Sequence, residues 1–137
     1  MPDLKLIQFG YETDTWKRLL NFMIEENIHL KIRLSEILQQ ISGVSLLEDL
    51  ENFQNRFIRQ DEFTSLLRDD IAELDGLLMR EIFEDGKIIN KIDRKLLKLR
   101  SNIINAETQF SKLKIDFNNF LAMMLHDSNG KAFNQKQ

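Results

Sequence analysis

The segment EENIHLK, residues 25–31, holds the side chains that come nearest to a chemical site in this sequence. Glu26 and His29 are three residues apart, which places a carboxylate and an imidazole on one side of a helix. Di-iron carboxylate bundles use Glu-x-x-His motifs from two helices, together with two further inward carboxylates. This chain has one such motif, because Met123 rather than an acidic residue stands three positions before His126. A metal site at Glu26 and His29 would need a second copy of the chain, and we expect no bound metal.

His29 is also the candidate for phosphoryl transfer. The stretch HLKIRLSEIL, residues 29–38, superficially resembles the dimerisation helix of sensor histidine kinases. That family has an acidic residue directly after the histidine and a proline a few residues later, whereas Leu30 and Leu34 occupy this neighbourhood here. Histidine-phosphotransfer proteins have a lysine three residues after the histidine, where this chain has Ile32. These departures favour the polar side of an ordinary helix, with metal binding or phosphotransfer at Glu26 and His29 as the alternative function.

Other catalytic signatures are absent from the sequence. It contains no G-x-x-x-x-G-K-[ST] or G-x-G-x-x-G phosphate-binding motif, no H-E-x-x-H and no G-x-S-x-G. The absence of cysteine excludes disulfides, thiolate metal sites and cysteine nucleophiles. We therefore predict that the chain is not an enzyme and uses no cofactor.

Composition and charge restrict the classes of partner. The net charge of −3 does not favour non-specific binding to nucleic acid. The first residues lack the cationic start and apolar run of a secretory signal. No window approaches the roughly 18 consecutive apolar residues that a membrane span needs. With a cysteine-free composition that suits a reducing compartment, these features lead us to expect a cytoplasmic protein.

Three long segments carry apolar residues at alternating intervals of three and four, the spacing of a helix that packs along one face. No comparable segment shows the period of two that is typical of strands, so the pattern predicts an all-α fold. The three series are Trp16, Leu20, Met23, Asn27, Leu30, Leu34, Ile37, Ile41; Leu46, Leu50, Phe53, Phe57, Gln60, Thr64, Leu67, Ile71, Leu74, Leu78; and Ile89, Ile92, Leu96, Leu99, Ile103, Ala106, Phe110, Leu113, Phe117, Phe120, Met124.

Turn residues divide the chain between these series. Gly43 can adopt the left-handed conformation that ends a helix, and Ser45 with Glu48 forms an S-x-x-E capping box that would open the next one. Asp85-Gly86 closes the second helix. Connections this short make neighbouring helices antiparallel. The prediction is an elongated antiparallel three-helix bundle, up-down-up with coiled-coil-like packing. Its expected divisions are an N-terminal segment at 1–13, a bundle at 14–126 with helices near 14–41, 45–85 and 88–125, and a polar tail at 127–137.

The N-terminal segment is rich in apolar residues. Residues 3–11 include Leu4, Leu6, Ile7 and Phe9, and Gly10 allows the chain to bend before the first helix. A first helix near 14–41 would leave one end of the longer hairpin without a third partner. We expect residues 3–11 to run extended over that end and to pack against it, on the same chain or exchanged onto a dimer partner. A frayed terminus is the alternative.

Polar residues interrupt the apolar series at matching depths. Asn27 stands in the first series, and Gln60 and Thr64 stand in the second. Reflection through the turn at Gly43 places Asn27 opposite residue 59. The sequence therefore predicts one buried polar layer, which fixes the register of the helices at some cost in stability.

Several apolar residues face away from the packed series. Ile28 and Ile32 lie outward on the first helix, Leu66 on the second and Ile104 on the third. Several such residues on long rods indicate a second surface. We therefore predict self-association, most simply as a homodimer, or docking of a protein partner on a helix face. The interpretation is a non-catalytic helical interaction or scaffold module.

Charge is unevenly distributed over the second and third helices. A basic cluster between Lys87 and Arg100 follows an acidic stretch that includes Glu73, Asp75 and Glu81. An antiparallel hairpin brings the two together, so internal pairing is expected rather than a nucleic-acid surface.

Overall fold

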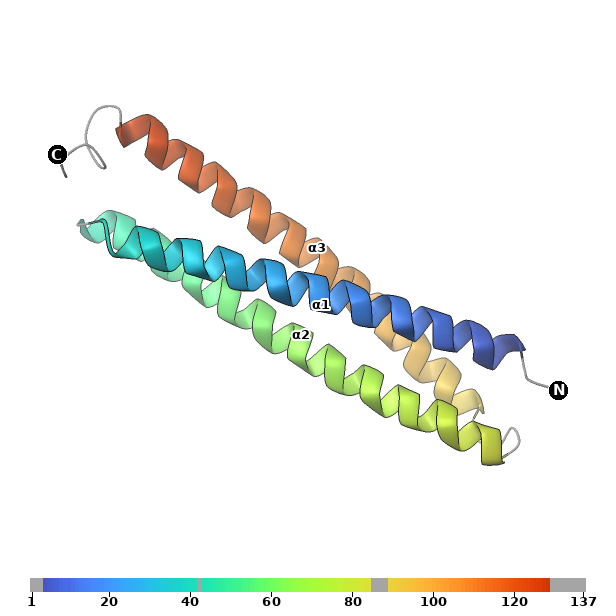
Figure 1. Ribbon diagram of the computed structural model, residues 1–137. Helices are drawn as coiled ribbons and strands as arrows, with labels where there is room; N and C mark the ends of the chain where they lie inside the picture. The colour runs from blue at the N-terminus through green and yellow to red at the C-terminus, as the bar shows by residue number, and fades with distance from the viewer. Residues whose placement is uncertain (1–3, 42, 85–88, 129–137) are drawn as a thin grey trace.

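The computed structural model describes residues 4–41, 43–84 and 89–128, which form three long helices (Figure 1). They are α1 (Leu4–Leu38), α2 (Val44–Glu84) and α3 (Ile89–Ser128). α1 packs along α2 and α2 packs along α3, whereas α1 and α3 contact each other more sparsely. The all-α prediction is confirmed, and the arrangement is that of an up-down three-helix bundle.

The buried residues follow the predicted spacing along each helix. Fully buried side chains include Leu20 on α1, Phe57 on α2 and Phe117 on α3. The rings of Phe57 and Phe117 meet edge to face, with centroids 5.1 Å apart. Such a contact adds to the free energy gained from burying the rings. Burial of one stripe per helix therefore explains why three amphipathic segments assemble around a common core.

The N-terminal residues are part of α1, which begins at Leu4. The expectation of an extended segment at residues 3–11, with a bend at Gly10 and a helix start near 14, was wrong. The core series continues back from Trp16 through Thr13 to Phe9, and both of these residues are buried. Thr13 can occupy a core position because its hydroxyl donates to the Gly10 carbonyl at 3.0 Å.

The same correction removes the gap that the extended segment was expected to cover. α1 has 35 residues, close to the 41 of α2 and the 40 of α3. Phe9 is only 4% exposed, and Leu6 packs against the core cluster. Packing at this end of the bundle is thus supplied by about three more turns of helix, residues 4–13.

The first connection differs in detail from the predicted capping. α1 ends at Leu38 with a tighter turn, in which the Gln40 amide donates to the Ile37 carbonyl at 2.9 Å. α2 begins at Val44, so Ser45 lies inside the helix and the Ser45–Glu48 capping box does not open it. Gly43 precedes the helix instead: it has φ 140°, and its carbonyl accepts from the Leu47 amide at 3.1 Å. A positive φ favours glycine at this position.

One expected turn and most of the expected tail fall on residues whose placement is not described. The Asp85-Gly86 turn lies outside the described residues. Of the expected polar tail at 127–137, Asp127 and Ser128 belong to α3, and residues 129–137 lie outside the described residues. None of the helices in the described ranges is long and apolar enough to cross a membrane.

Candidate functional site

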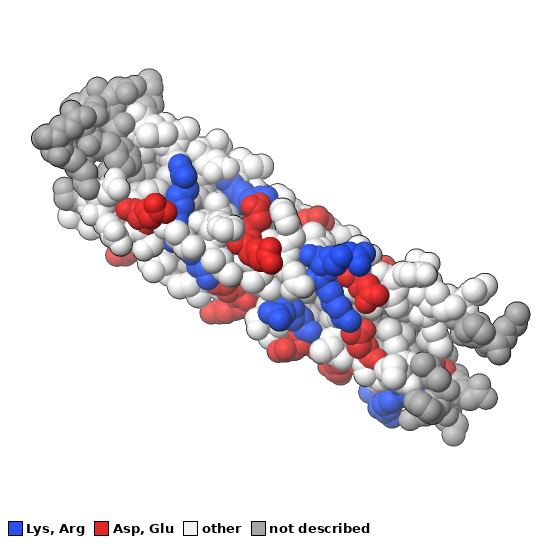
Figure 2. Space-filling view, in the orientation of Figure 1, with Lys and Arg blue, Asp and Glu red and all other residues white. Residues whose placement is uncertain are grey.

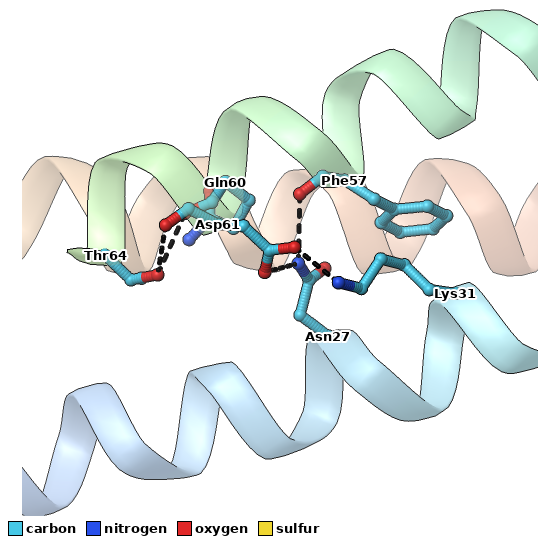
Figure 3. Close-up of polar contacts among 6 residues, drawn as sticks. All are labelled: Asn27, Lys31, Phe57, Gln60, Asp61 and Thr64. Atoms are coloured by element: carbon cyan, nitrogen blue, oxygen red, sulfur yellow. Dashed lines mark hydrogen bonds and ion pairs between the residues drawn. The ribbon is translucent and has the colours of Figure 1, made fainter.

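A layer of polar side chains crosses the middle of the core (Figure 3). Asn27, Gln60 and Thr64 are all buried, with exposed fractions of 1%, 4% and 2%. The Asn27 amide Nδ2 donates to the Phe57 carbonyl at 3.0 Å and to Asp61 Oδ1 at 2.7 Å. These bonds tie α1 to α2 at one depth.

Gln60 makes the corresponding connection to α3. Its Nε2 donates to the Ala106 carbonyl at 3.3 Å. Thr64 behaves differently, because its hydroxyl donates to the Gln60 and Asp61 carbonyls of its own helix, at 3.0 and 3.1 Å. Asn27 and Gln60 therefore bridge helices, whereas Thr64 satisfies its hydroxyl locally.

Two charged residues, Lys31 and Asp61, complete the layer, and neither was predicted from the sequence. Lys31 donates to Asp61 Oδ2, the second oxygen of the carboxylate that Asn27 bonds (Figure 3). Both side chains are only about a third exposed, at 37% and 34%. Their spacing was the available signal, since Lys31 is one helical turn beyond Asn27 and Asp61 is adjacent to Gln60.

One atom of this layer has no partner. Asn27 Oδ1 is buried and accepts no hydrogen bond from the described residues. A buried carbonyl oxygen without a donor loses hydration and gains nothing in return, which lowers stability. The Asn27 amide and the Lys31 ammonium both donate to the Asp61 carboxylate, so these bonds connect α1 to α2.

Glu26 and His29 have different surroundings on α1. The Glu26 carboxylate accepts from Lys114 Nζ of α3 at 3.2 Å. The side chain of His29 is exposed on α1. Among residues 4–41, 43–84 and 89–128, no group of three or more His, Cys, Asp or Glu side chains could hold a metal ion. Glu26 thus serves as one half of an interhelical ion pair.

The basic start of α3 is partly paired within the bundle. Lys95 contacts Glu73 of α2 at 2.8 Å, and its hydrogen bond lowers the pKa of the Glu73 carboxyl. Arg100 pairs with Glu12 of α1, and Asp75 of α2 pairs with Lys17 of α1. The cluster's first residue, Lys87, lies outside the described residues. On the face in Figure 2, basic and acidic side chains alternate along the bundle instead of forming a patch of one sign.

The predicted interaction residues are all exposed. The exposed fractions are 44% for Ile28, 52% for Ile32, 62% for Leu66 and 61% for Ile104. They come from three helices and point away from one common core. A single partner surface could not contact all four on one copy of the bundle.

The hollows between the helices are shallow grooves. One groove of about 230 Å³ lies between the end of α1 and the end of α3, where Ile37, Leu121 and Met124 form its floor beside Arg33 and Glu36. Gln40 also lines this groove, so three of its seven lining residues are polar or charged.

No model of a protein family matches this chain, and comparisons with curated proteins and with solved structures found no similar chain.

Proposed function

We propose that this chain is a non-catalytic helical interaction module that binds a second helical chain through its outward faces. The observation that supports this proposal is the number of large apolar side chains that stay exposed after the core is filled. On α3 alone they include Leu97, Ile104, Ile115 and Met123, each at 59% exposed or more. Exposed apolar residues repeated along one element are typical of surfaces that bind another protein.

The polar layer supports the same class of function. Asn27 and Lys31 both donate to Asp61, and Gln60 donates to the α3 backbone. These groups are occupied in structural bonds, which leaves helix faces as the surfaces available for recognition. A fixed register is useful to a scaffold because it presents the outward residues of the three helices in a constant arrangement.

The experiment compares the native size of the full chain with that of a surface variant. The variant combines Ile28→Glu, Ile32→Glu, Leu66→Glu and Ile104→Glu, all at exposed positions. In extract from the native host, the unmodified chain should migrate as part of an assembly larger than a monomer. The variant should migrate as a folded monomer, with its helix content checked by circular dichroism.

A matched control replaces four exposed polar residues of the same helices, Asn21→Glu, Gln54→Glu, Ser65→Glu and Asn105→Glu, and should leave the assembly intact. The proposal fails if the unmodified chain migrates as a monomer in the extract. It also fails if the purified chain carries stoichiometric iron, manganese or zinc, the result that metal binding through Glu26 and His29 requires.

A further inference from the structure

The outer face of α3 carries a second heptad series, distinct from the one that faces the core. Its positions alternate at intervals of four and three, all of them are exposed, and none is charged. They are Leu97, Ser101, Ile104, Thr108, Ser111, Ile115, Asn118 and Ala122, which we name the outer stripe. At ~1.5 Å per residue the outer stripe is roughly 38 Å long.

The outer stripe is peculiar to α3. The equivalent outward line on α2 contains Glu51, Glu62 and Asp69. That on α1 contains Asp14, Arg18 and Glu25. Solvent-facing helical positions usually carry charge in a chain with 30% charged residues, so an uncharged line of this length needs a reason.

Nothing in the described chain covers this line. In the view of Figure 1, α1 and α2 both lie below the C-terminal half of α3, and no described helix lies above it. The three large side chains of the outer stripe are among the most exposed apolar groups, with 62% for Leu97, 61% for Ile104 and 59% for Ile115.

We propose that the outer stripe is a homodimer interface, in which α3 of one copy packs parallel and in register against α3 of a second copy. This proposal rests on the proposed interaction function and names its surface and its partner. A two-fold axis along α3 would place Leu97, Ile104 and Ile115 each against the same residue of the second copy. The small residues between them, Ser101 and Thr108, allow close approach of the two helices.

The charges beside the outer stripe fit this arrangement. Glu107 and Lys112 flank it on opposite sides, both are exposed, and neither has an ion-pair partner among the described residues. In a parallel pair of helices, the residue directly before every second interface position faces the residue five places later on the partner helix. Glu107 directly precedes Thr108 of the outer stripe, and Lys112 is five places after Glu107. Glu107 of each copy would therefore face Lys112 of the other, and the contact occurs twice.

An antiparallel pairing fits the same residues less well. It would set Glu107 opposite Lys114 of the second copy, but Lys114 already bonds Glu26 of its own chain at 3.2 Å. The parallel arrangement instead uses two charges, Glu107 and Lys112, that have no ion-pair partner among the described residues. Charge complementarity thus favours a parallel second copy over an antiparallel one.

Sedimentation of the purified full chain from about 1 to about 500 μM tests self-association over the range in which small interfaces dissociate. We expect a monomer–dimer equilibrium. Ile104→Glu should weaken it at least about tenfold, since two carboxylates would meet in the interface. Leu66→Glu, at a matched exposure of 62% on α2, should leave it unchanged.

A cysteine substitution tests whether the two α3 helices are parallel or antiparallel, since the chain has no cysteine of its own. Ile104→Cys should form a disulfide-linked dimer under mild oxidation, because residue 104 faces itself only in the parallel register. In an antiparallel pair, Leu97 of one copy would lie opposite Ala122 of the other, and Ile104 would lie opposite Ile115. The two Ile104 residues would then be roughly 16 Å apart along the helix axis. That separation is beyond the reach of a disulfide.

Charge reversal provides the final check. Glu107→Lys and Lys112→Glu should each weaken the dimer severalfold, and the double variant should recover it. The inference is overturned if the chain is monomeric throughout, if Leu66→Glu dissociates a dimer that Ile104→Glu leaves intact, or if Ile104→Cys fails to cross-link. None of these results removes the proposed function, which depends on assembly in the host extract.

Discussion

Glu12 on α1 and Arg100 on α3 form a two-pronged ion pair, with Nε to Oε2 at 2.6 Å and Nη2 to Oε1 at 2.8 Å. The two residues are 88 positions apart in sequence. Lys5–Asp93 and Glu26–Lys114 have the same separation of 88. Three ion pairs with one offset show that α1 and α3 run parallel in a single register, although their direct packing is sparser than that of α2 on either neighbour.

A double-mutant cycle on Glu12 and Arg100 should give a coupling free energy of about 0.5–1 kcal/mol, typical of partly exposed pairs with good geometry. The hydrogen bond from Arg100 to Glu12 raises the pKa of the guanidinium, so Arg100 keeps its charge during the measurement. Urea unfolding of Glu12→Gln, Arg100→Gln and the double variant measures the coupling. The charge-reversed pair, Glu12→Arg with Arg100→Glu, should recover most of the loss, and no recovery would contradict this assignment of the register.

The sequence predicted this register only in part. Heptad spacing and short connections were enough for three helices, their order and most of the core, because burial of an apolar stripe is a local pattern. The offset between α1 and α3 could not be predicted, because it depends on the two connections and on how α1 and α3 each pack against α2. The start of α1 was also misplaced, at residue 14, since the polar Thr13 interrupts the apolar series and its hydroxyl bond to Gly10 is not visible in a sequence.

Replacement of Phe9 by alanine tests the helical N-terminus. Phe9 is 4% exposed and belongs to the core cluster, so Phe9→Ala should lower the free energy of unfolding by about 3 kcal/mol. Leu4→Ala is the control, because Leu4 is 80% exposed and should change stability by less than about 0.5 kcal/mol. Thermal unfolding of both variants gives the comparison. Equal effects would mean that this part of α1 does not pack as described.

The ion pair between Lys17 of α1 and Asp75 of α2 predicts that the free energy of unfolding changes with pH in the alkaline range. The hydrogen bond to Asp75 is the main cause that raises the pKa of Lys17 above its ordinary value of 10.5. A raised pKa in the folded state means that the pair stabilises the fold below pH 10.5 and loses this contribution as the pH rises through the folded pKa.

The difference in unfolding free energy between the unmodified chain and Lys17→Met should therefore be constant from neutral pH to about pH 10 and shrink above it. Lys17 is 46% exposed at its side chain, so the effect is expected to be small. Arg33→Met serves as the control, because Arg33 is exposed and forms no ion pair with the described residues. A difference for Lys17→Met that grows above pH 10 would contradict the sign.

The two amides of the polar layer that bridge helices, Asn27 and Gln60, were predicted from the sequence. Its two charged residues, Lys31 and Asp61, were not. Asn27 and Gln60 each interrupt a series of apolar residues, and this interruption is apparent from the sequence alone. Lys31 and Asp61 lie beside the series on the polar flank, where dozens of charged residues look alike. Only the side-by-side packing of α1 and α2 shows that Asp61 is the common partner of Asn27 and Lys31.

Asn27→Leu should stabilise the bundle by about 1 kcal/mol, because it removes the buried Oδ1 that has no donor and adds apolar surface to the core. Asp61 keeps its bond to Lys31, so the substitution leaves no new buried charge without a partner.

Asn27→Asp is the opposing variant at the same position. It removes both bonds from Nδ2 and sets a second carboxylate where the Asn27 amide lies 2.7 Å from Asp61, so it should destabilise by more than about 2 kcal/mol at neutral pH. Chemical denaturation of both variants measures the changes, and native hydrogen exchange of α1 amides reports on register. If Asn27→Leu is more stable but exchanges faster along α1, the amide is retained for alignment rather than for stability. A loss of stability in Asn27→Leu would show instead that the bonds to Phe57 and Asp61 outweigh the unsatisfied oxygen.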